Sequence, residues 1–227
     1  MAEHVLIITG GSLDIGWTKK WYAQYQQEFT TVIAADAGLM SAQKAGIEPD
    51  QIIGDYDSVQ AEVLEQCREQ GTQIVTFPKE KDYTDTELAI ETALELIGKQ
   101  ESAASGSITI LGATGTRLDH TMTNIGLMLK ADAADVHCTM YDAHNKIYIG
   151  HAGQEYIIAK AEQYGDYVSY MPIGGMVRGL TLRGFFYPLT DYTFESGLGI
   201  GVSNVITEEF GKISFSEGKL IIFETKD

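Results

Sequence analysis

Two aspartates separated by one residue, Asp55 and Asp57, follow the apolar pair Ile52-Ile53 in this sequence. On a turn that ends a strand, this spacing places carboxylate oxygens within reach of one hard cation. Mg²⁺ favours one or two carboxylates, with water and phosphate oxygens completing its octahedral shell. Aspartates in such turns also commonly cap a helix or stay solvated, so the pair alone leaves both interpretations open.

A second acidic turn, Lys81-Asp82-Tyr83-Thr84-Asp85, stands directly before a predicted helix. The helix macrodipole favours an aspartate near a helix start, so one carboxylate there needs no further role. Two carboxylates beside a lysine and a hydroxyl favour a site for metal and phosphate.

A third turn, Gly112-Ala113-Thr114-Gly115, precedes Arg117, Asp119 and His120. Glycines after a strand let the backbone approach a ligand, and the next helix presents its N–H groups to an anion. Arg117 adds a planar fork suited to phosphate. An ordinary tight turn, with Asp119 capping its own helix, accounts for the same residues equally well. His120 is not expected to be the catalyst, and no Gly-Lys-Ser/Thr phosphate loop occurs.

The elements that must position these turns alternate between short apolar strands and helical patterns, which predicts an α/β fold with a parallel sheet covered on both faces. Ligands of such sheets bind beyond the carboxyl ends of the strands, so we expect the aspartates to gather there. In the segment 84–97 a capping box at Thr84 and a terminal Gly98 frame the helix. Strands are predicted at 5–8, 31–35, 52–53, 73–77 and 107–111, and helices at about 17–28, 38–46, 58–70, 84–97 and 118–130.

The character of the chain changes near residue 146, where short strands separated by glycine-containing turns predict an antiparallel β-sandwich. The domains are therefore expected at 1–145 and 146–227. A Glu217-Gly218 turn between apolar runs predicts a C-terminal hairpin, and Phe185, Phe186 and Tyr187 are expected in the core, one of them a candidate for stacking. Strands are predicted at 146–149, 155–158, 167–170, 177–182, 200–204, 213–215 and 220–223.

The charge of this 227-residue chain limits the classes of partner that it can bind. Its net charge of −16, from 16 basic and 32 acidic residues, argues against nucleic acid and anionic membranes as partners. Cys67 and Cys138 stand in no metal-ligand spacing and are typical of a reducing compartment. No signal peptide or membrane span is apparent, so a soluble, cytoplasmic protein is expected.

Several of these motifs occur together and in order, and as a set they resemble the bacterial type of thiamine pyrophosphokinase across nearly the whole chain. The sequence departs from the family pattern at Ala37 and Thr116, both in backbone turns where glycine is common. The motifs that carry the resemblance are Asp36-Ala37-Gly38, Gly54-Asp55-Tyr56-Asp57-Ser58, Lys81-Asp82-Tyr83-Thr84-Asp85, Gly112-Ala113-Thr114-Gly115, Arg117-Leu118-Asp119-His120 and Val202-Ser203-Asn204.

The resemblance implies that the α/β domain binds ATP and Mg²⁺, and that the β-sandwich forms a homodimer. Thiamine would then bind between the two domains of different subunits. Carried over position by position, the catalytic and metal-binding carboxylates are Asp55, Asp57, Asp82 and Asp85. The implied nucleotide- and substrate-binding residues are Asp36, Lys81, Thr84, Gly112, Gly115, Arg117 and Asp119, with Ser203 and Asn204 facing the thiamine end.

The expected reaction is attack of the thiamine hydroxyl on the β-phosphorus of ATP, which gives thiamine diphosphate and AMP. Two alternatives stay open. Asp55-Tyr56-Asp57-Ser58-Val59 also satisfies the nucleophile motif of haloacid-dehalogenase-like phosphatases, although it follows about the third strand rather than the first. A non-catalytic sensor that binds Mg·ATP is the other.

Overall fold

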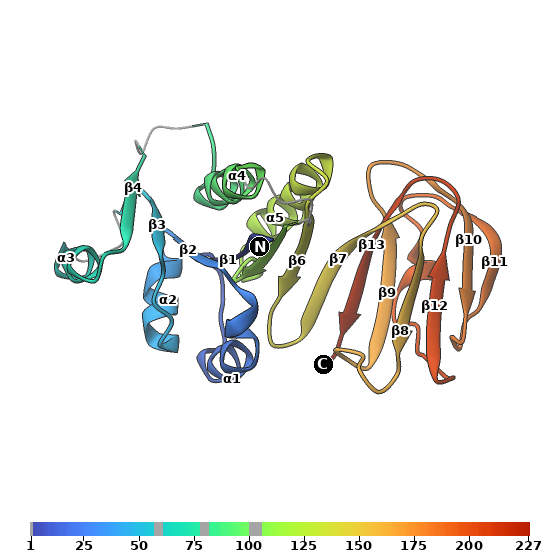
Figure 1. Ribbon diagram of the computed structural model, residues 1–227. Helices are drawn as coiled ribbons and strands as arrows, with labels where there is room; N and C mark the ends of the chain where they lie inside the picture. The colour runs from blue at the N-terminus through green and yellow to red at the C-terminus, as the bar shows by residue number, and fades with distance from the viewer. Residues whose placement is uncertain (1, 57–60, 78–81, 100–105) are drawn as a thin grey trace. The chain divides into compact units, whose positions relative to one another are not determined.

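Parallel strands alternate with helices through the N-terminal half of the computed structural model, which describes residues 2–56, 61–77, 82–99 and 106–227 (Figure 1). Two units can be distinguished, Met1–Ala143 and His144–Asp227, and the division falls two residues before the expected one. The first unit contains strands β1 (His4–Ile8), β2 (Thr31–Ala35), β3 (Gln51–Gly54), β4 (Gln73–Thr76), β5 (Ser107–Leu111) and β6 (His137–Tyr141), and helices α1 (Ile15–Tyr25), α2 (Gly38–Ala45), α3 (Ala61–Glu69), α4 (Asp85–Gly98) and α5 (Leu118–Ala133).

The strands of the first unit lie in the order β4-β3-β2-β1-β5-β6, and all their pairings are parallel. Helices α1 and α2 lie on one face of this sheet, and α4 and α5 on the other (Figure 1). Val5, Leu6, Ile7 and Ile8 are fully buried, as a strand covered on both faces requires. The predicted parallel α/β architecture is confirmed.

Strand β1 pairs with β2 on one side and β5 on the other, so the strand order reverses between β1 and β5. At such a switch point the loops leaving the two strands diverge, and a crevice opens beyond their carboxyl ends. The sheet thereby fixes where a ligand site can form.

Helix boundaries follow local capping chemistry. Asp14 caps α1 by accepting a hydrogen bond from the Trp17 backbone N–H at 2.8 Å, and Thr84 caps α4 by accepting one from the Glu87 N–H at 3.2 Å. Thr84 therefore caps α4 as predicted, while the Glu87 carboxylate pairs with Lys130. The expected glycine stop was wrong, because Gly98 is the last helical residue and Lys99 is the C-cap.

The second unit contains the β-strands of a two-sheet sandwich. Strand β13 pairs antiparallel with β7 and β9, and the second sheet has the order β11-β10-β12-β8. Tyr170 and Leu220 from the first sheet and Leu180 and Ile213 from the second belong to one buried cluster. The strands are β7 (Asn145–His151), β8 (Glu155–Ala159), β9 (Tyr167–Pro172), β10 (Val177–Arg183), β11 (Leu189–Phe194), β12 (Phe210–Ser214) and β13 (Lys219–Thr225).

Two local expectations for this unit were wrong. The segment 200–204 is not a strand: it contains a 3₁₀ turn, Gly199–Gly201, and Ser203 adopts a φ of 58°. The Glu217-Gly218 turn does not close a hairpin, because β12 and β13 belong to different sheets. Strands β6 and β11 were missed, since polar residues interrupt their apolar patterns.

No helix in the described parts of the chain is long and apolar enough to cross a bilayer.

The loops that follow β1 and β5 are joined by hydrogen bonds at the switch point. The Gly11 N–H donates to the Gly112 carbonyl and the Ser12 N–H to the Thr114 carbonyl, both at 2.8 Å. The buried Thr9 hydroxyl also donates to the Gly112 carbonyl, at 2.5 Å. A side chain at Gly11 would place its Cβ 2.0 Å from the Gly112 oxygen, so the two loops can approach only through glycine.

We expect Gly11→Ala to lower the free energy of unfolding by about 1–3 kcal/mol, because its Cβ forces the two backbones apart. Gly126→Ala is the matched control: nothing lies within 4 Å of a Cβ there, and alanine in a helix is favoured by roughly 0.5–1 kcal/mol. Chemical denaturation of both variants checks this. Equal stability of Gly11→Ala and the parent chain would contradict the inferred close contact.

Candidate active site

A pocket of about 570 Å³ opens in the first unit at the carboxyl edge of the sheet. Its walls come from the loops after β1, β2, β3 and β5 and from the first turns of α4 and α5. The lining residues are Thr9–Ser12, Ala35–Ala37, Asp55, Tyr83–Thr86, Gly112–Arg117, His120, Thr121 and Asn124. This is the place that the reversal of strand order predicts for a ligand.

Three carboxylates, Asp36, Asp55 and Asp85, enter the pocket from three different turns. Asp36 adopts a left-handed φ of 45°, and its N–H donates to the Ile53 carbonyl at 2.8 Å. Gly54 allows this approach, because a Cβ there would lie 3.2 Å from the Asp36 Cα. The tight packing of these two turns brings carboxylates from β2 and β3 to one wall.

Tyr56 fixes the turn that carries Asp55. Its hydroxyl donates to the Val75 carbonyl at 2.6 Å, at the end of the neighbouring strand β4. Burial, as the main cause, raises the pKa of Tyr56 to about 12, so the phenol stays neutral and keeps its donor. Asp55 is therefore held on a turn that is anchored to two strands.

The opposite wall offers backbone donors to an anion. Gly112 has a φ of 73°, and a Cβ there would lie 2.5 Å from the Thr9 carbonyl oxygen, so this turn requires glycine. Helix α5 begins directly after the loop, and the first N–H groups of a helix have no backbone acceptor within it, although that of His120 donates to Asp119 Oδ1 at 3.0 Å. Glycine loop, helix N-terminus and the Arg117 guanidinium together can hold phosphate groups.

Arg117 and Asp119 form a bidentate ion pair at the N-terminus of α5. Arg117 Nη2 lies 2.5 Å from Asp119 Oδ2, and Nε donates to Oδ1 at 3.2 Å. Both side chains are mostly exposed, and Asp119 does not line the pocket. Asp119 thus orients Arg117 beside the anion wall instead of joining the three carboxylates.

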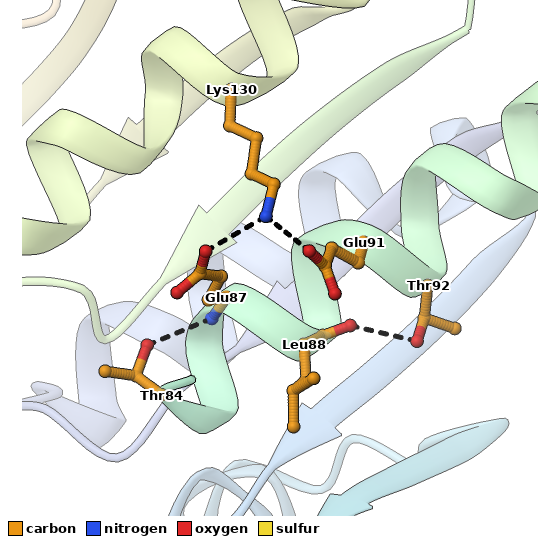
Figure 2. A network of polar contacts seen from close by, with 6 residues as sticks. All are labelled: Thr84, Glu87, Leu88, Glu91, Thr92 and Lys130. Carbon is orange, nitrogen blue, oxygen red and sulfur yellow. Dashed lines mark hydrogen bonds and ion pairs between the residues drawn. The ribbon is translucent and has the colours of Figure 1, made fainter. Parts of the chain in front are cut away.

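Lys130 of α5 holds the pocket's two helices together (Figure 2). Its ammonium lies 2.9 Å from Glu87 Oε1, also contacts Glu91, and sits 5.7 Å from the centre of the Tyr83 ring. Figure 2 shows Lys130 reaching from α5 to both glutamates, with Thr84 capping α4 at Glu87. Because Thr84 and Asp85 line the pocket, this network sets the distance between its α4 and α5 walls.

The structure brings together seven of the residues predicted for the site. Asp82 and Asp119 are outside the pocket lining, and Asp57 and Lys81 lie outside the described residues. Asn124 and the Thr9–Ser12 loop were missed, although the glycine pair after the first strand was a usable signal. The seven are Asp36, Asp55, Thr84, Asp85, Gly112, Gly115 and Arg117.

Ser203 and Asn204 belong to the second unit. Asn204 is buried, and its side chain donates to the Tyr187 carbonyl at 2.9 Å and accepts from the Tyr187 N–H at 3.0 Å. The Ser203 N–H donates to the Ser169 hydroxyl at 2.9 Å. Asn204 thus fastens the 203–205 segment to Tyr187. The expected burial holds for Phe185 but was wrong for Phe186 and Tyr187, which are 62% and 61% exposed.

The hydrogen bond from Arg117 is the main cause that lowers the pKa of Asp119 to about 2. A lowered pKa means that the pair is intact above the ordinary value of 3.8 and is lost as the pH falls through about 2. We expect Arg117→Gln to raise the Asp119 midpoint toward 3.8, as measured by a carboxyl-carbon NMR titration. Arg68→Gln, at an exposed pair in α3, is the control that leaves it unchanged. An identical midpoint in Arg117→Gln and the parent would rule out this pairing.

Comparison with known proteins matches the two units to two family models. Residues 22–140 match the thiamin pyrophosphokinase catalytic domain, and residues 155–220 match the thiamin pyrophosphokinase vitamin B1 binding domain. The thiamine pyrophosphokinase of Bacillus subtilis is 34% identical over 203 residues, which cover 89% of this chain and 91% of that protein.

Solved structures agree with these matches. The crystal structure of thiamine pyrophosphokinase from Bacillus subtilis aligns with a TM-score of 0.83 and 30% identity over 99% of this chain and 100% of that one. The one from Geobacillus thermodenitrificans aligns with a TM-score of 0.79 and 32% identity, over 99% and 98% of the two chains. Motifs, fold and both family models therefore agree: this chain belongs to the thiamine pyrophosphokinase family.

Proposed function

We propose that this chain transfers the pyrophosphoryl group of ATP to thiamine at the pocket beyond β1 and β5. The observation that carries the proposal is the juxtaposition of three carboxylates with a glycine-rich anion wall, in a chain of this family. The thiamine hydroxyl oxygen forms a bond to the β-phosphorus. The bond from that phosphorus to the oxygen bridging to the α-phosphorus breaks, AMP leaves with that oxygen, and the hydroxyl proton is released.

The anion wall binds the triphosphate in this proposal. Backbone N–H groups at Gly112 and Gly115 and at the start of α5 donate hydrogen bonds to the phosphate oxygens, and Arg117 adds a charged donor. Thr84 contributes its hydroxyl from the other wall, and Lys81 adds a second cation. Transfers of this kind depend mainly on positioning and charge neutralisation, which these groups supply.

The carboxylates fit a divalent cation. Asp36, Asp55 and Asp85 are hard oxygen donors that line one pocket, but the described residues contain no group of three or more His, Cys, Asp and Glu side chains that could hold a metal ion by themselves. Mg²⁺ bound to nucleotide is held in this open manner, by one or two carboxylates and the phosphates. We propose Asp55, Asp57, Asp82 and Asp85 as the candidates for its coordination; of these, Asp55 and Asp85 line the pocket. When bound, Mg²⁺ neutralises the phosphate charge.

The protein's own carboxylates have a second task. In a chain of net charge −16, an acidic pocket attracts cationic thiamine. Asp85, at the first turn of α4, is our candidate for orienting the thiamine hydroxyl and accepting its proton.

The second unit completes the site through a homodimer in this proposal. Phe186, Tyr187 and Val202 are at least half exposed. The Phe186 N–H donates to the Val205 carbonyl at 2.8 Å and the Tyr187 N–H to Asn204 Oδ1 at 3.0 Å. An exposed apolar patch of this kind is typical of an interaction surface. Ser203, in the same segment, is proposed to face thiamine, with Asn204 holding the segment in place.

We propose that the protein acts in the cytoplasm. Cys67 and Cys138 are free and buried, and unpaired thiols are typical of a reducing compartment.

Incubation with ATP, Mg²⁺ and thiamine should release AMP and thiamine diphosphate in equal amounts, measured by ion-exchange chromatography. Asp55→Asn should lower turnover by at least about 100-fold, because it removes charge from the reacting centre. Glu95→Gln, at a 71%-exposed position of α4, is the control. Inorganic phosphate with a phosphoenzyme would indicate a phosphatase, unchanged ATP a sensor, and near-normal Asp55→Asn activity would exclude Asp55 from the mechanism.

Val202→Asp should convert the dimer into a monomer and reduce thiamine use, because it puts a charge into the proposed apolar interface. Light scattering coupled to size-exclusion chromatography gives the mass. Ile157→Asp, at a 56%-exposed position of β8, is a control expected to stay dimeric. A parent chain that runs as a monomer at micromolar concentration would overturn the shared site.

A further inference from the structure

Asn124 is a buried polar residue on the wall of the pocket. It lies in the second turn of α5, is 7% exposed and lines the cavity, yet belongs to no motif that predicted the site. Its side-chain Nδ2 donates to the Ala113 carbonyl at 2.8 Å. This bond ties the middle of α5 to the glycine loop that follows β5.

The bond to Ala113 also determines which way the amide faces. A backbone carbonyl can only accept a hydrogen bond, so the atom that contacts it must be the nitrogen of Asn124. The Oδ1 atom lies in the same amide plane and consequently points to the opposite side of the Cβ–Cγ bond. Its orientation is set by the protein before any ligand binds.

The Oδ1 atom borders open space. Within the described parts of the chain, Trp21 Nε1 is the one fully buried side-chain polar atom that lacks a partner. Asn124 Oδ1 has no partner among those residues and is not fully buried, so it reaches a cavity, and the cavity beside Asn124 is the pocket. A buried amide with one end anchored and the other facing a cavity is a fixed acceptor.

We propose that Asn124 Oδ1 accepts a hydrogen bond from a hydroxyl or amino group of a substrate, and so selects for that donor. The inference rests on the proposed function and deepens it. Phosphate oxygens are acceptors and would be repelled there, so this part of the pocket receives the ribose or base of the nucleotide, or the hydroxyl or amino group of thiamine. A site built to accept from such a donor rejects analogues that lack it.

The test combines a change in the ligand with a change in the protein, as in a double-mutant cycle. The parent chain is assayed with ATP, 2′-deoxy-ATP, 3′-deoxy-ATP and purine riboside triphosphate, and with thiamine and its analogue in which an oxo group replaces the amino group. Thiamine lacking its hydroxyl is compared by binding. We expect one analogue to lose about tenfold in kcat/KM or affinity, the size of one neutral hydrogen bond. The analogue with the lower kcat/KM or affinity shows whether the donor group belongs to the nucleotide or to thiamine.

Asn124→Ala should lose about tenfold with the natural substrate and nothing further with that same analogue. Any loosening of the Ala113 loop affects both ligands equally and cancels in this comparison. Thr123→Ala, at the exposed neighbouring position of α5, should keep the parent's discrimination. The proposal would be overturned if the analogue lost as much kcat/KM or affinity in Asn124→Ala as it does in the parent chain. It would also be overturned if the parent chain used every analogue as well as its natural ligand.

Failure of the proposed reaction is distinguished by calorimetry. If the parent chain forms no AMP, the same cycle is measured as binding of ATP, thiamine and their analogues without turnover. A donor-dependent loss that disappears in Asn124→Ala supports the acceptor role even then. Binding that is indifferent to every donor removes it, whatever the reaction.

Discussion

The parallel pairing of β1 with both β2 and β5 is the constraint on which the site depends. It sends the two following loops apart at one edge of the sheet, and hydrogen bonds from Gly11 and Ser12 then hold the loops together at their bases. The crevice is therefore rigid at the bases of the loops and open beyond them. Glycine is needed where the backbones meet, since a Cβ at Gly11 or Gly112 would overlap a carbonyl oxygen.

The acidic groups and the anion-binding groups lie on different walls of the pocket. Asp36, Asp55 and Asp85 lie on turns next to β2, β3 and α4, whereas the glycine loop, the start of α5 and Arg117 form the anion-binding side. Asp119 lies outside this arrangement because its carboxylate is paired with Arg117. The acidic wall suits a cation and the other wall suits phosphate, and a metal–nucleotide complex carries both charges.

The two helices that complete the pocket are held by one interaction behind it and one on its wall. Lys130 joins α5 to Glu87 and Glu91 of α4, and Asn124 joins α5 to Ala113. Glu87 directly follows the α4 residues that line the cavity, and Asn124 and Ala113 line it themselves. A ligand therefore meets walls whose spacing is already set, and preorganised donors need no rearrangement during a reaction.

Local chemistry by itself determined the α/β class, the capped start of α4 at Thr84, the acidic and glycine-rich turns, and through them the family. These features depend on neighbours in the chain, such as the Thr84–Glu87 hydrogen bond. Tertiary structure decided what depends on distant partners: the crossing of the Glu217-Gly218 turn between sheets, the exposure of Phe186, the pairing of Asp119 and the fixed amide of Asn124. Sequence spacing does not encode which atom a side chain meets across the fold, because that partner is set by strand order and helix packing.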